Sequence, residues 1–137
     1  MYATKQDLID RYGFEELERY AWDAVADAVD DAKVTRAITD ASEEVNLYIG
    51  GVTRLPLDTT PPALTRITAD IARYQLQDDS PLDEARERYK QAVGALRDIA
   101  AGRAILFRAE APPTGATVAA LRDDTDRIFT RETLDQF

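Results

Sequence analysis

Aspartate and glutamate are the residues of this chain that could carry out chemistry, because the 137-residue sequence contains neither histidine nor cysteine. The absence of histidine removes the commonest general base and metal ligand, and the absence of cysteine removes thiol nucleophiles and disulfides. Asp40 and Glu44 lie one helical turn apart, next to Glu43, in the manner of an acid–base pair. We expect these acids to form the solvated face of a helix, because no histidine, no second metal-site cluster and no glycine-rich phosphate loop accompanies them.

A second acidic group consists of Asp123, Asp124 and Asp126, whose oxygens are ligands that divalent cations prefer. The group lacks the glycine and the distal glutamate of a calcium-binding loop, so we expect a solvated turn or a helix start. The pair Gly50 and Gly51 is too short to cradle a phosphate. The sequence therefore predicts no catalytic residue, no metal site, no cofactor and no enzymatic activity.

The charge of the chain also limits its partners. Acidic residues number 26 and basic residues 17, which gives a formal net charge of −9. Because non-specific DNA binding depends on Lys and Arg that neutralise phosphates, this balance disfavours it. The charge suits plain solubility, or a surface that repels DNA moving past it. No apolar run approaches the roughly 20 residues of a membrane span, and the N-terminus lacks a signal-peptide stretch, so we expect a cytosolic location without membrane contact.

The elements that position these side chains are predicted to be helices. Thr4, with Asp7 three residues later, predicts a capped helix over residues 5–12 that stops at Gly13. A short helical piece over residues 14–20 follows. Residues 22–31 contain alanine, valine and aspartate, and we expect a variable connection with some helix there.

Three apolar stripes at three- and four-residue steps predict the core helices, around residues 34–49, 64–76 and 82–99. The first stripe is Val34, Ile38, Ala41, Val45 and Tyr48, and the opposite face carries Arg36, Asp40, Glu43 and Glu44. Gly50 and Gly51 are expected to end the first of these helices in a left-handed conformation. Thr60 and Ser80 are expected to cap the second and third, and Gly102 to end the third.

The predicted fold is all-α, a small antiparallel bundle of about four helices with an extended loop and a C-terminal docking tail. The bundle is assigned to residues 1–102, and a linker with the tail to residues 103–137. Asp70, Arg73 and Arg66 lie on the second core helix among apolar neighbours. They form either a buried or half-buried ion pair, or an ordinary surface pair worth well under about 1 kcal/mol.

The loop and the tail are the predicted contact elements, because large apolar residues in a terminal segment suggest docking, within the molecule or across a subunit interface. The candidate contact residues are Gly50, Gly51, Arg54, Leu55, Pro56, Arg127, Phe129, Arg131, Leu134 and Phe137.

Several motifs occur together in an order that resembles small proteins encoded in the head-gene cluster of Mu-like phages and prophages. They are the opening residues 1–13, an Ala-Ser to Gly-Gly segment at 41–51, Leu-Pro-Leu at 55–57, the Pro-Pro step at 61–62, Asp-Ile-Ala-Arg-Tyr at 70–74 and the closing residues 127–137. The chain has Val52 and Thr53 where the family usually has Arg-Tyr.

The resemblance implies a virion structural role similar to that of head–tail connector proteins, which are helical bundles that form a ring beneath the portal. Implied partners are further copies of the chain, the portal protein and a tail-side stopper or terminator protein, with DNA passing through the ring without specific binding. The implied location is the neck of the virion, with the host cytoplasm before assembly. The alternative is an acidic binding or regulatory module, a DNA mimic that occupies a DNA-binding protein.

Overall fold

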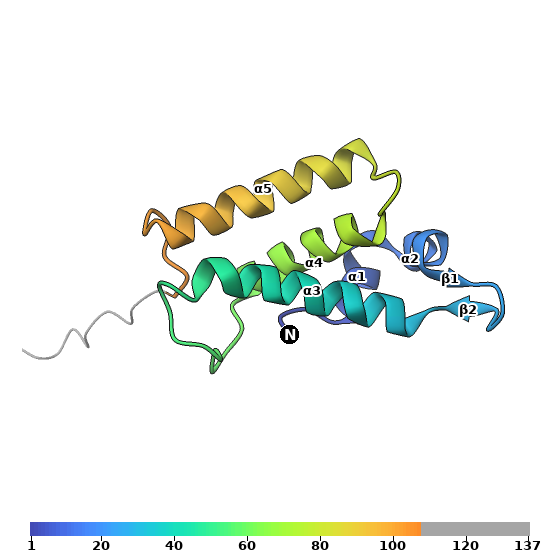
Figure 1. Cartoon of the computed structure of the whole chain (residues 1–137), viewed down its shortest axis with the longest axis horizontal. Coiled ribbons are helices and arrows are strands. Elements are labelled where there is room, and N and C mark those ends of the chain that lie inside the picture. Colours follow the sequence, from blue (N-terminus) through green and yellow to red (C-terminus); the bar gives the residue numbers. More distant parts are fainter. Residues whose placement is uncertain (108–137) are drawn as a thin grey trace, which may run out of the picture. The chain divides into compact units, whose positions relative to one another are not determined.

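A computed structural model describes residues 1–107 of the chain (Figure 1). These residues form the helices α1 (Lys5–Tyr12), α2 (Phe14–Ala21), α3 (Asp31–Ile49), α4 (Pro62–Leu76) and α5 (Asp83–Ala100). Two short strands, β1 (Trp22–Asp23) and β2 (Ala28–Val29), pair antiparallel between α2 and α3. The predicted helical class is therefore confirmed in its main part. In the described part of the chain, no helix is long and apolar enough to cross a membrane.

The core is built by the three long helices, α3, α4 and α5, which all pack on one another. Figure 1 shows α4 running between α3 and α5, and α4 also contacts α1. The predicted stripes are buried against each other, with Val34 and Val45 on α3, Ile67 and Ile71 on α4, and Leu96 on α5. The predicted arrangement of about four helices is not confirmed, because two short helices pack against a core of three long ones within residues 1–107.

The N-terminal helix begins and ends as its sequence predicts. The Thr4 hydroxyl accepts a hydrogen bond from the Asp7 backbone N–H at 3.2 Å, and the Asp7 carboxylate accepts one from the Thr4 N–H at 2.7 Å. This reciprocal arrangement is a capping box, which satisfies two backbone donors at the helix start. The helix ends before Gly13, whose φ of 88° is unfavourable for residues with a side chain.

The expected helical content of residues 22–31 is wrong, because this stretch is a β-hairpin. The Asp23 carboxylate accepts hydrogen bonds from the backbone N–H groups of Val25 and Ala26 and so holds the turn. Asp30 then accepts bonds from Ala32 and Lys33 at 2.9 and 3.0 Å and acts as the N-cap of α3. These side-chain bonds outweigh the helix preference of the alanines, and α3 begins at Asp31.

Three predicted helix ends also differ from the structure. Gly50 ends α3 in a right-handed conformation (φ −61°), so the expected left-handed cap is wrong. Thr60 does not cap α4, because Pro61 occupies the N-cap position and Pro62 begins the helix. Ser80 does not cap α5, because its N–H bonds back to the Gln77 carbonyl and the helix begins only at Asp83.

The buried Gln77 side chain serves the start of α5 instead of Ser80. Its oxygen accepts the Leu82 backbone N–H at 2.9 Å. At the other end, α5 stops at Ala100, and Gly102 follows with a φ of 73°, consistent with the predicted stop. The compact unit continues past residue 102 to Phe107, because Leu106 packs against the core.

We expect the two adjacent glycines at the end of α3 to respond in opposite ways to alanine. A Cβ atom at Gly50 would lie 2.9 Å from the Asn46 carbonyl oxygen, whereas a Cβ at Gly51 would meet open space. Gly50→Ala should lower the free energy of unfolding by about 1–3 kcal/mol, because the backbone must shift. Gly51→Ala should raise it by about 0.5 kcal/mol, because the unfolded chain loses conformational freedom. Urea denaturation measures both, and equal effects would contradict this account of Gly50.

Candidate functional site

The segments at one end of the three-helix core form an open surface that we call the loop end, residues 50–61 and 101–107. Thr53 to Thr59 and Phe107 line a hollow of about 610 Å³ there. The structure therefore brings the predicted contact residues Arg54, Leu55 and Pro56 together. Arg54 and Pro56 are exposed, whereas Leu55 is half-buried against the core. Because the hollow is open to solvent, it suits contact with a surface better than enclosure of a small molecule.

A second hollow of about 280 Å³ adjoins the first and is more apolar in its lining. Val52, Ile105 and Phe107 contribute to it, and all three side chains are exposed to solvent. Sequence reasoning did not select these three residues as contact residues. The available signal was the apolar run at 105–107 directly after the helix-terminating Gly102, since apolar residues with no core to fill often mark contact surfaces.

The remaining predicted contact residues have separate outcomes. Gly50 and Gly51 are exposed at the start of the loop. The tail residues Arg127, Phe129, Arg131, Leu134 and Phe137 lie outside the described residues, as do the acids Asp123, Asp124 and Asp126. The contact role of the tail therefore stays a prediction.

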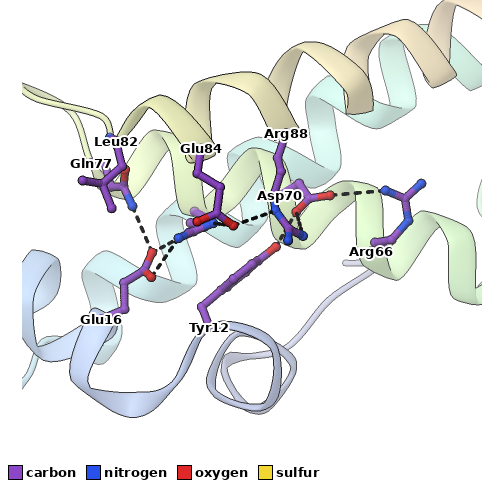
Figure 2. Close-up of polar contacts among 9 residues, drawn as sticks. Tyr12, Glu16, Arg66, Asp70, Gln77, Leu82, Glu84 and Arg88 are labelled. Atoms are coloured by element: carbon purple, nitrogen blue, oxygen red, sulfur yellow. Dashed lines mark hydrogen bonds and ion pairs between the residues drawn. The ribbon is translucent and has the colours of Figure 1, made fainter.

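The interior contains a charged cluster where α1, α2, α4 and α5 meet (Figure 2). The Asp70 side chain on α4 is 1% exposed and accepts a hydrogen bond from the Tyr12 hydroxyl at 2.6 Å. The guanidinium groups of Arg66 and Arg88 approach its oxygens at 3.4 and 3.9 Å. Burial, and then the hydrogen bond to Asp70, raise the pKa of Tyr12 well above its ordinary value.

Arg73 is the second buried charge of α4, only 6% exposed. Its Nε and Nη2 atoms donate to the two oxygens of Glu16 on α2, and its guanidinium lies 4.5 Å above the Tyr12 ring. Glu84 on α5 approaches at 3.6 Å. Burial alone would lower the pKa of Arg73, but the hydrogen bond and charge of Glu16 outweigh burial and hold that pKa above its ordinary value.

These contacts decide between the two alternatives for Asp70 and Arg73. Both side chains are buried, so the surface-pair alternative is wrong for them. They do not pair with each other, since each takes its partners from other elements. Gln77 extends the cluster, because its amide donates to Glu16 at 2.9 Å while its oxygen holds the start of α5.

Glu44 corrects another expectation, because it is half-buried and does not lie on a solvated face. Its carboxylate accepts hydrogen bonds from the Tyr89 hydroxyl at 2.9 Å and from the Gln75 amide at 3.3 Å, which ties α3 to α5 and α4. Tyr89 also stacks on Tyr74 with ring centroids 4.3 Å apart. Asp40, by contrast, is exposed beside Lys33 and Arg36. The two acids therefore have different surroundings.

The cluster has the properties of a structural element. Its charges are paired with one another, and the space beside Tyr12, Glu16 and Arg73 holds only about 10 Å³, too little for a substrate. Within residues 1–107, no group of three or more His, Cys, Asp or Glu residues could hold a metal ion. The loop end is therefore the candidate functional site, and the buried cluster supports the helices behind it.

We expect Tyr12→Phe to destabilise the fold by about 1–3 kcal/mol, because the buried Asp70 carboxylate loses its closest donor. Tyr20→Phe is the matched control. The Tyr20 ring also packs against the core, but within residues 1–107 its hydroxyl makes no hydrogen bond. The control should cost less than about 0.5 kcal/mol. Urea unfolding at neutral pH compares the two, and equal losses would show that the Asp70 contact contributes little.

We expect stability to fall in alkali through Tyr89. Burial, and then the hydrogen bond to Glu44, raise the pKa of Tyr89 to about 12. An unfolded tyrosine ionises near pH 10, so the stability that Tyr89 contributes is complete below about pH 10 and is lost as the pH rises towards 12. Wild-type protein should therefore lose more stability between about pH 9 and pH 11 than Tyr89→Phe. Equal losses in both proteins would contradict the shift.

Comparison with known proteins identifies the family. The family model described as "Bacteriophage Mu, Gp36" matches residues 2–122. The "Mu-like prophage FluMu protein gp36" of Haemophilus influenzae is 40% identical over 102 residues, which cover 74% of this chain and 72% of that protein. "Gene product J" of Escherichia phage Mu is 28% identical over 135 residues, covering 96% and 95%. The match confirms the resemblance to Mu-like phage proteins, and the chain belongs to the bacteriophage Mu Gp36 family.

Proposed function

We propose that this chain is a structural subunit of the phage virion, a head–tail connector or head-completion protein that forms a ring between portal and tail. Its proposed partners are further copies of itself, the portal protein and a tail-side stopper or terminator protein. DNA would pass through the ring without specific binding, and the protein would reside in the neck of the virion after synthesis in the host cytoplasm.

Two observations support the proposal: the chain belongs to a Mu phage family, and its loop end is exposed. Arg54 and Pro56 stand exposed there beside Val52, Ile105 and Phe107. Exposed apolar groups rimmed by polar side chains are typical of protein–protein contact surfaces. Paired buried charges fix the helices of the core, so the loop end would be a contact surface on a rigid support.

The acidic balance of the chain suits passage of DNA. A formal net charge of −9 gives repulsion from phosphates, and a ring lined by such subunits would let the duplex slide without adhering. The proposed role requires neither catalysis nor a cofactor, in keeping with carboxylates that are engaged in structural hydrogen bonds. The acidic regulator, our alternative, would need acidic runs spaced like the phosphates of DNA.

We expect this protein in mature particles at a copy number close to that of the portal protein. Quantitative mass spectrometry of gradient-purified particles, from the phage or prophage that carries this gene, measures the ratio. A non-structural protein of the same phage serves as the control for carry-over. Tailless heads from a mutant that still incorporates the portal protein distinguish components of the neck from components of the tail. Absence from mature particles would contradict the virion role and would make the acidic regulator the leading hypothesis.

A further inference from the structure

We propose that copies of this chain associate end to end, with the hairpin end of one copy docked on the loop end of the next. The hairpin end is residues 22–31. The inference deepens the proposed function and rests on it, because it names the two faces through which subunits of a ring would meet.

The hairpin end presents apolar side chains that its own fold does not need. Val25, in the turn between β1 and β2, is 96% exposed, and Trp22 is 45% exposed. Turn positions usually carry polar residues or glycine, because these satisfy the backbone or the special dihedral angles of the turn. A valine at the tip of a turn and a tryptophan beside it therefore suit a contact with another surface better than they suit solvent.

The two apolar ends lie too far apart to cover each other within one molecule. The hairpin precedes the first residue of α3, and the loop follows its last residue (Figure 1). Because α3 has 19 residues, its ends are separated by about 28 Å at a rise of 1.5 Å per residue. Any contact between a hairpin end and a loop end is therefore a contact between two molecules.

The charges of the two ends are complementary, which favours a second copy as the occupant. Residues 22–31 carry aspartates at positions 23, 27, 30 and 31 and no basic residue. Asp31 is already paired with Lys5, and Asp23 and Asp30 accept backbone N–H groups, so Asp27 is the acid of this end without a partner within residues 1–107. Residues 50–57 carry Arg54 and no acid, and residues 101–107 carry Arg103 and no acid. Arg103 is already paired with Asp98, and Asp58 also lines the hollow. Arg54, which is exposed and pairs with no carboxylate within residues 1–107, is the cation that the exposed Asp27 of another copy would meet.

The same charges decide the symmetry of the association. Two hairpin ends placed face to face would bring aspartates against aspartates, which is unfavourable. A hairpin end against a loop end is a heterologous contact, because different surfaces of two identical molecules meet. Repetition of such a contact produces a closed ring or an open filament, depending on the rotation between neighbours.

The test uses the full chain and two variants that each damage one end. Val25→Asp places a charge in the apolar contact of the hairpin end, and Ile105→Asp does so at the loop end, where Ile105 is 84% exposed. Leu47→Asp is the matched control, since Leu47 is 85% exposed on α3 and belongs to neither end. Circular dichroism melts check that all three variants stay folded.

Sedimentation velocity over a concentration series to about 1 mM gives the association constants. Wild type and Leu47→Asp should associate, and more weakly as salt is raised, because salt screens Arg54 from the aspartates. Val25→Asp and Ile105→Asp alone should each lose at least about tenfold in association constant. An equimolar mixture of the two variants should form one-to-one dimers and nothing larger, since each variant keeps the end that the other has lost.

Three results would overturn the inference: monomeric wild type throughout, association unchanged in both variants, or a mixture that stays monomeric although wild type associates. If wild type is monomeric, the two ends would be contact surfaces for a different protein. The particle measurement is independent of these outcomes. If the protein is present in particles but copies do not associate end to end, only this inference is contradicted. If copies associate end to end but the protein is absent from particles, only the virion role is contradicted.

Discussion

The fold depends on two buried charges on α4, Asp70 and Arg73. A buried carboxylate or guanidinium is tolerated only where partners replace the water it has lost. Asp70 finds a hydroxyl from α1, and Arg73 finds a carboxylate from α2 and the face of the Tyr12 ring. Because each buried charge needs its partner, the positions of the two short N-terminal helices on the long helices are fixed. Apolar packing alone would specify these positions less closely.

A second set of polar bonds secures the long helices to one another. Glu44 joins α3 to α5 through Tyr89 and to α4 through Gln75. Gln77 joins the end of α4 to the start of α5 and also to Glu16. Because these bonds lie among apolar contacts, each is costly to break and specific in its geometry. The interior is consequently well determined while both ends of the core keep exposed apolar residues.

That contrast between a fixed interior and exposed ends is informative about function. A monomer that worked alone would gain nothing from Val25 or Ile105 in solvent, because neither side chain contributes to the core. A subunit of an assembly requires such residues, and it also requires a support that holds their positions before the partner arrives. The fold is thus suited to repeated contacts of one geometry, which the connector proposal requires.

The sequence by itself determined the local and periodic features. Apolar residues at three- and four-residue steps marked the core faces of α3, α4 and α5, and Thr4 with Asp7 marked the first helix, because these signals act over a few residues. The loop residues Arg54, Leu55 and Pro56 could also be selected, and the structure gathers them around one hollow. The order of motifs was enough to indicate the phage family.

Only the tertiary structure decided what depends on residues far apart in the chain. The partners of Asp70 and Arg73 are Tyr12 and Glu16, which are more than fifty positions away, so no local pattern could name them. The same reason explains why Glu44 was expected on a solvated helix face and why Phe107 was not predicted to lie beside the loop. The hairpin at residues 22–31 escaped prediction because side-chain bonds of Asp23 and Asp30, and not periodicity, fix its shape. Periodicity reports which face of a helix is buried, but three-dimensional packing alone decides which polar groups meet there.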